Sequence, residues 1–280
     1  MGNLLCVVRE PAKADSLIGY VARLARELKS HVHFVYVEEE YEYTIGRPPA
    51  AENYTGDEQS RRLNQARLVL SERVETVLGE LRNEVSLDYS AELTSIISAV
   101  DDYVNRHRPD MVVIEAEESK GLMFDRTSNE ELIDEIKSPV LLVPRDIVFW
   151  PIKLIVYATA YNEKDVLALR DLVKITSELN PSIQILHVNT DEGSGEQMGS
   201  LDFADTIRKQ TGYSDISLEN LSAENNESVT DMINDYTSTV NADLLVVLKD
   251  EKKFFERLFN PDRTKKIARK TDLPVLIYKF

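Results

Sequence analysis

The sequence has little cysteine and glycine and lacks any long apolar run. Its 280 residues include one cysteine, Cys6, so we expect neither an internal disulfide nor a zinc site built on cysteine ligands. No stretch of 18 or more apolar residues occurs, and we therefore expect no membrane-spanning helix. The N-terminus reaches Arg9 and Glu10 without a basic segment ahead of it, so we expect no signal peptide. These absences predict a cytoplasmic protein.

Basic residues are also scarce compared with acidic ones. There are 33 Lys and Arg residues against 49 Asp and Glu residues, and the formal net charge is -16. Such a surface repels the phosphates of nucleic acids and anionic lipids, so we expect neither a nucleic-acid nor a membrane partner. The hydrophobic fraction of 42% is ordinary for a globular protein and is enough for one or two packed cores.

The chain repeats one pattern of strands and helices in its two halves. Short apolar segments typical of buried strands alternate in each half with amphipathic helical stretches, which indicates parallel sheets covered by helices. We expect two domains, 1–146 and 152–280, joined by a short link. The matching strand segments are 4–8 and 153–157, 31–37 and 182–188, 109–114 and 242–247, and 138–143 and 273–278.

Each half ends with the same two segments, an apolar run led by Asp and a later Pro-Val-Leu run. They are Asp110–Ile114 and Ser138–Val143 in the first half, and Asp243–Val247 and Leu273–Ile277 in the second. In this pattern the chain resembles a tandem member of the universal stress protein family. The resemblance implies two doubly wound, Rossmann-like α/β domains, each a five-stranded parallel sheet of order 3-2-1-4-5 with helices on both faces. It also implies an intrachain pseudo-dimer of the two domains and a role in stress survival or metabolic signalling.

The loop after the fourth strand departs from the nucleotide-binding members of that family. Those members carry Gly-x2-Gly-x9-Gly-Ser/Thr there, because glycines let backbone N–H groups crowd around phosphates. In 114–127 only Gly121 remains, and three carboxylates stand where phosphates would lie: Glu115, Glu117 and Glu118. The corresponding stretch 248–255 contains no glycine. Both nucleotide sites are therefore predicted to be degenerate.

The resemblance still places candidate nucleotide- or anion-binding residues in both halves. In the first half they are Arg9, Ser119, Lys120, Gly121, Arg126 and Thr127, and in the second Lys252, Lys253 and Arg263. The basic stretch has a structural alternative, because Asn260 and Pro261 suit the start of a solvated helix. Ser128 and Glu131 likewise form a capping box at the start of the equivalent helix in the first half.

Catalytic and metal-binding patterns find no support in the sequence. His31 and His33 alternate on a strand and so share a face, but no Cys, His or Asp cluster completes a ligand set. No nucleophile elbow, P-loop or His-Glu-x-x-His motif occurs. We therefore predict no catalytic residue and no metal site.

Taken together, these patterns predict a non-catalytic stress-response or regulatory protein that acts by binding a small ligand, a protein partner or a second copy of itself, with no cofactor. The alternative is an adenine-nucleotide (ATP) binding stress protein, such as a slow ATPase, that uses the first domain. The loop 38–57 carries Tyr41, Tyr43 and Tyr54. It is a lid, a contact surface or a solvated excursion.

Overall fold

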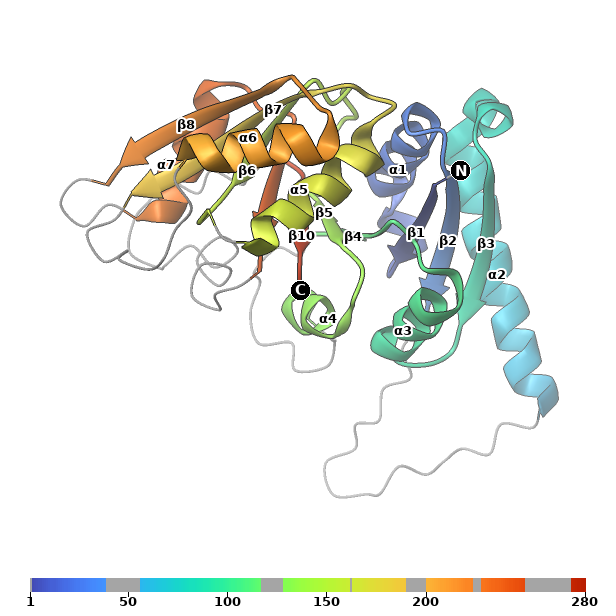
Figure 1. Cartoon of the computed structure of the whole chain (residues 1–280). Coiled ribbons are helices and arrows are strands. Elements are labelled where there is room, and N and C mark those ends of the chain that lie inside the picture. Colours follow the sequence, from blue (N-terminus) through green and yellow to red (C-terminus); the bar gives the residue numbers. More distant parts are fainter. Residues whose placement is uncertain are drawn as a thin grey trace, which may run out of the picture. The chain divides into compact units, whose positions relative to one another are not determined.

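A computed structural model of the chain describes residues 2–38, 56–116, 128–161, 163–189, 200–223, 228–249 and 273–280 (Figure 1). The chain divides into two compact units, unit 1 over residues 1–149 and unit 2 over residues 150–280. No helix in the described ranges is both long and apolar enough to cross a membrane.

The sheet of unit 1 has five parallel strands. They lie in the order β3-β2-β1-β4-β5, which is the predicted order 3-2-1-4-5. Strands β1, β4 and β5 are almost entirely apolar and buried, because both of their faces are covered. The strands are β1 (Asn3–Val8), β2 (His31–Val37), β3 (Leu87–Glu92), β4 (Met111–Glu115) and β5 (Val140–Val143).

Helices cover both faces of this sheet. Helix α1 (Asp15–Glu27) packs against α2 (Gly56–Leu78), and α3 (Ile96–His107) packs against α4 (Asn129–Glu135). Connections between parallel strands are right-handed, and the chain reverses its direction across the sheet after β3. The pair α1 and α2 therefore lies on one face and the pair α3 and α4 on the other. Short 3-10 helices, η1 (Pro11–Lys13) and η2 (Gly79–Glu84), precede α1 and follow α2.

The first helix is amphipathic, as predicted. Its buried face consists of apolar residues at helical spacing: Leu17, Ile18, Val21, Leu24, Ala25 and, just after its end, Leu28. At α4 the predicted capping box is present, because the Ser128 hydroxyl accepts a hydrogen bond from the Glu131 N–H and the Glu131 carboxylate accepts one from the Ser128 N–H. The equivalent helix predicted to start at Asn260 lies outside the described residues.

Unit 2 repeats the topology of unit 1. Its strands are all parallel and lie in the order β8-β7-β6-β9-β10, which is again 3-2-1-4-5. The elements are β6 (Leu154–Ala158), α5 (Glu163–Thr176), β7 (Ser182–Asn189), α6 (Ser200–Thr211), β8 (Ile216–Ser222), α7 (Val229–Thr239), β9 (Leu244–Leu248) and β10 (Val275–Tyr278). The fold is thus two tandem doubly wound α/β domains.

Candidate functional site

The place to expect a ligand in unit 1 is the carboxyl end of β1 and β4. These two strands pair in parallel, and the order of the sheet reverses between them. In doubly wound sheets, ligands bind in the crevice that opens at such a reversal. Glu115 is the last residue of β4, and Arg9 and Glu10 follow β1 directly. The fold therefore brings these three charged residues to one end of the sheet.

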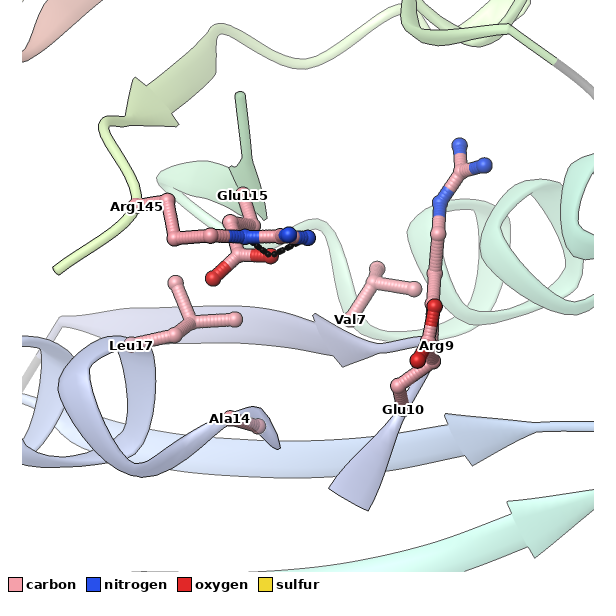
Figure 2. Close-up of a pocket in the computed structure, with 7 residues that line it drawn as sticks. All are labelled: Val7, Arg9, Glu10, Ala14, Leu17, Glu115 and Arg145. Atoms are coloured by element: carbon pink, nitrogen blue, oxygen red, sulfur yellow. Dashed lines mark hydrogen bonds and ion pairs between the residues drawn. The ribbon is translucent and has the colours of Figure 1, made fainter. Parts of the chain in front are cut away.

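A small cavity lies at this position (Figure 2). Its volume is about 60 Å³, and it is lined by Val7, Arg9, Glu10, Ala14, Leu17, Glu115 and Arg145. The lining is apolar on the side of β1 and α1 and charged elsewhere. Pockets for drug-sized ligands usually measure roughly 300–1,000 Å³, so this cavity suits water or a small chemical group.

An ion pair occupies one wall of the cavity. The Arg145 guanidinium, which follows β5, donates from Nε and Nη2 to Glu115 Oε2 at 3.2 and 2.9 Å (Figure 2). The other oxygen, Glu115 Oε1, is buried and has no hydrogen-bond partner among the described residues. A buried acceptor without a donor costs about 1–3 kcal/mol, so this oxygen favours a water or a ligand N–H in the cavity.

Arg9 is the one predicted site residue that the described part of the chain contains, and it lies at this cavity. Its Nη2 donates to Asn129 Oδ1 at 3.2 Å, and the Asn129 amide donates to the Glu115 backbone oxygen at 2.8 Å. Asn129 is the first residue of α4, so the helix start connects β1 to β4. Figure 2 shows the Arg9 guanidinium extended away from the ion pair of Glu115 and Arg145.

The other predicted residues fall outside the described ranges. Five of them lie in 117–127 and three in 250–272. They are Ser119, Lys120, Gly121, Arg126 and Thr127 in the first segment, and Lys252, Lys253 and Arg263 in the second.

The single cysteine lies on β1 beneath the cavity but offers no nucleophile. Cys6 is fully buried. Burial raises the pKa of the Cys6 thiol far above its usual range, and the charge of Glu115 raises it further. Because the thiolate is the reactive form, this residue is chemically inert at neutral pH.

The corresponding strand end in unit 2 is built around a buried carboxylate. Asp165, in the first turn of α5, is 1% exposed. It accepts hydrogen bonds from the Tyr157 and Thr159 hydroxyls, both at 2.8 Å, and from the Ala160 N–H at 3.2 Å. These bonds fold the chain after β6 back onto the start of α5.

An aromatic group fills the space beside this carboxylate. The ring of Tyr161 lies 4.5 Å from the ring of His187 on β7 and 5.1 Å from the ring of Phe203 on α6. Its hydroxyl donates to Asn220 Oδ1 on β8 at 2.9 Å. Sequence analysis named none of the residues Tyr161, Asp165, Phe203 and Asn220 as a candidate.

The two histidines of β2 do share a face, as predicted. His33 Nε2 contacts Ser90 Oγ at 2.9 Å and His33 Nδ1 contacts Asp88 Oδ1, while His31 Nε2 lies 3.3 Å from the same carboxylate oxygen. Within the described ranges, no group of three or more His, Cys, Asp or Glu residues is placed to hold a metal ion. The contacts explain both histidines as polar packing between β2 and β3.

Solved structures with the same fold cover nearly the whole chain. A universal stress protein from Archaeoglobus fulgidus DSM 4304 is 12% identical with a TM-score of 0.68, over 99% of this chain and 98% of that one. A putative universal stress protein from Pseudomonas aeruginosa UCBPP-PA14 is 12% identical with a TM-score of 0.55, over 99% and 92%. The cytoplasmic domain of a prokaryotic cation chloride cotransporter is 13% identical with a TM-score of 0.55, over 99% and 94%.

The comparisons by sequence found no match, whereas the comparison by structure did. No family model matches the chain, and no curated protein matches it. The structural likeness establishes that both units have the universal stress protein fold.

Proposed function

We propose that this protein is a non-catalytic regulatory protein of the universal stress type, which acts by binding a small ligand or a protein partner. The proposal includes a cytoplasmic location, domain bounds of 1–146 and 152–280, and pairing of the two domains as an intrachain pseudo-dimer. The fold supports the general class, but a fold alone does not decide function, as its occurrence in a cotransporter domain illustrates.

The observation that carries the proposal is the state of the strand ends in the two units. In unit 1 the ion pair of Arg145 and Glu115 occupies the end of β4. A carboxylate at this point repels the phosphates of a nucleotide. In unit 2 the ring of Tyr161 and the hydrogen-bonded carboxylate of Asp165 lie at the end of β6. Among the described residues at these two strand ends, the charged side chains bond mainly to other protein groups, which supports a structural or ligand-binding role.

The cavity of unit 1 supports small-ligand binding. It combines apolar contacts with a guanidinium from Arg9 and an unsatisfied carboxylate oxygen of Glu115. A small ligand with an N–H or O–H donor toward Glu115 fits this chemistry.

A second candidate function is binding of ATP, with slow hydrolysis, through unit 1. It is favoured by one observation, because Arg9 and Arg145 place two guanidinium groups at the strand reversal where this class of sheet binds ligands. The candidate residues Ser119, Lys120, Gly121, Arg126 and Thr127 belong to this alternative.

Calorimetric titration of the nucleotide-stripped full chain with Mg-ATP separates the two candidates. We expect no saturable heat at micromolar nucleotide, because Glu115 opposes the phosphates. Glu115→Gln then tests the cause, since removing the charge should raise any ATP affinity at least about tenfold, and Glu58→Gln on the exposed start of α2 is the matched control. Tight binding by the unchanged protein at one site per chain, lost in Gly121→Glu, would replace the first proposal with the second.

A further inference from the structure

Tyr161 holds a backbone conformation that bulky residues avoid. Its φ is 58°, in the left-handed region that normally favours glycine. Other non-glycine residues share a positive φ, but Lys29, Arg108, Asn180 and Asn241 lie where helices end, and there this conformation is common. Asp146 is in a turn after β5, and aspartate adopts this conformation more readily than a bulky residue. Tyr161 lies instead in the connection from β6 to α5. A strained residue that persists is held in place by its surroundings.

The Tyr161 side chain is held by contacts of the kind that hold an aromatic ligand in a binding site. The side chain is 4% exposed. Its ring makes a tilted contact with the ring of His187 and an edge-on contact with the ring of Phe203, and its hydroxyl is bonded to Asn220. Two aromatic walls and one polar group that fixes orientation are the usual elements of a small-molecule site.

Tyr161 lies on a connection, whereas the three residues that its side chain contacts lie on strands and a helix. His187, Phe203 and Asn220 are on β7, α6 and β8, so regular elements fix their backbones. Tyr161 is on a connection, where its N–H bonds to the Thr159 hydroxyl at 2.8 Å. Thr159 and Ala160 are bonded to Asp165 of α5, and Thr159 O to His187 Nδ1 at 2.8 Å, so the change that releases the ring is a rotation of Tyr161 itself.

The polar end of this site lies beside an exposed residue. Asn220 is exposed, although the ring that it binds is buried. A ligand that replaced the tyrosine ring would place its polar group next to this exposed amide.

We propose that His187, Phe203 and Asn220 form a binding site for a small planar aromatic ligand that carries an O–H or N–H donor, and that Tyr161 is the intramolecular competitor for this site. The phenol ring of Tyr161 occupies the site when no ligand is present. A ligand binds when the ring leaves, and departure of the ring relieves the left-handed backbone at the same time. This site is separate from the cavity of unit 1 and does not depend on its function.

Competition has a measurable consequence. If the site is free for only a small fraction of the time, the apparent dissociation constant is the intrinsic one divided by that fraction. Removal of the ring should therefore tighten binding by the ratio of closed to open states. Tyr161→Gly removes the ring and also places the residue best suited to a positive φ at this position.

The experiment is a calorimetric titration of the full chain with p-cresol, the side-chain analogue of tyrosine. We expect Tyr161→Gly to bind p-cresol at least about tenfold more tightly than the unchanged protein. Tyr161→Phe is the matched control, since it keeps the ring and loses only the hydroxyl bond to Asn220, and it should bind no more than about fivefold more tightly. Adding Asn220→Ala to Tyr161→Gly should weaken binding about fivefold, the effect of one hydrogen bond.

Two results would overturn the proposal. One is a folded Tyr161→Gly variant, with unchanged far-UV circular dichroism, that shows no saturable binding of p-cresol. The other is binding that Asn220→Ala leaves unaltered. If Tyr161→Gly does not fold on its own, refolding in millimolar p-cresol must restore its circular dichroism, and failure to do so also counts against the site.

Discussion

Two carboxylates at equivalent ends of the two sheets show how strongly surroundings decide the role of one chemical group. Asp165 accepts three hydrogen bonds and is enclosed. Glu115 is bonded to Arg145 through one oxygen, while its other oxygen is buried beside a cavity. The first carboxylate is therefore a structural centre, and the second has binding capacity left for a further group.

His33 allows a pH prediction at the scale of one residue. Burial lowers the pKa of His33 and outweighs the neighbouring Asp88, which acts to raise it. In the unfolded chain the pKa of a histidine is about 6.5. The unfolded state therefore takes up a proton first as the pH falls, so the stability that His33 contributes is present above this value and is lost as the pH falls through its lower folded pKa.

We expect the midpoint of the His33 ring resonances in an NMR titration to lie below that of an unfolded histidine. Unit 1 should also lose protection from hydrogen exchange in β2 between about pH 7 and 5. His33→Gln should flatten this dependence, whereas Lys174→Gln, on the exposed side of α5 in unit 2, serves as the control. A His33 midpoint above that of the unfolded chain would contradict the prediction.

At the scale of elements, the capping box of α4 is a local device with a predictable effect. The Ser128 hydroxyl caps the Glu131 N–H at 3.2 Å, and α4 is only seven residues long. Ser128→Ala should reduce the free energy of unfolding by about 1 kcal/mol, because one N–H at the start of the helix loses its acceptor.

The measurement is urea denaturation followed by far-UV circular dichroism. Ser128→Asp is the control, because aspartate is an equally good cap and its charge suits the start of a helix. A loss of stability in Ser128→Asp equal to that in Ser128→Ala would show that the cap is not the cause.

The elements that sequence analysis missed share one property. Strands β1, β4 and β5 were predicted because their apolar runs are buried on both faces. The outer strands β3 and β8 carry mixed polar sequences, and most of their residues are exposed or half-buried. An edge strand needs little apolar character, so periodicity gives no signal for it.

The candidate sites were predicted less well than the strands, for a related reason. Arg9 was proposed through the family resemblance, and the capping pair of Ser128 and Glu131 was recognised because its members are three residues apart. Asp165 was hidden in an amphipathic helix, and the partner of Tyr161 is Asn220, 59 residues later in the chain. Contacts of that kind depend on the finished fold and leave no local pattern.

For the molecule as a whole, the charge balance gives the clearest expectation. With 49 acidic against 33 basic residues, we expect no saturable binding to double-stranded DNA at about 50 mM salt, because the surface repels the phosphates. Fluorescence anisotropy with a labelled duplex checks this. Saturable binding that weakens with salt and is lost in the double variant Lys252→Gln and Lys253→Gln would contradict it and point to the basic stretch.

The native thiol should not react with maleimide reagents, because Cys6 is buried away from solvent on β1 and its raised pKa keeps it protonated. A cysteine introduced on an exposed helix, such as Glu58→Cys in unit 1 or Asp235→Cys in unit 2, would therefore take a fluorophore without removal of the natural residue. A chain labelled at both positions would report the distance between the units by energy transfer while p-cresol or Mg-ATP is added.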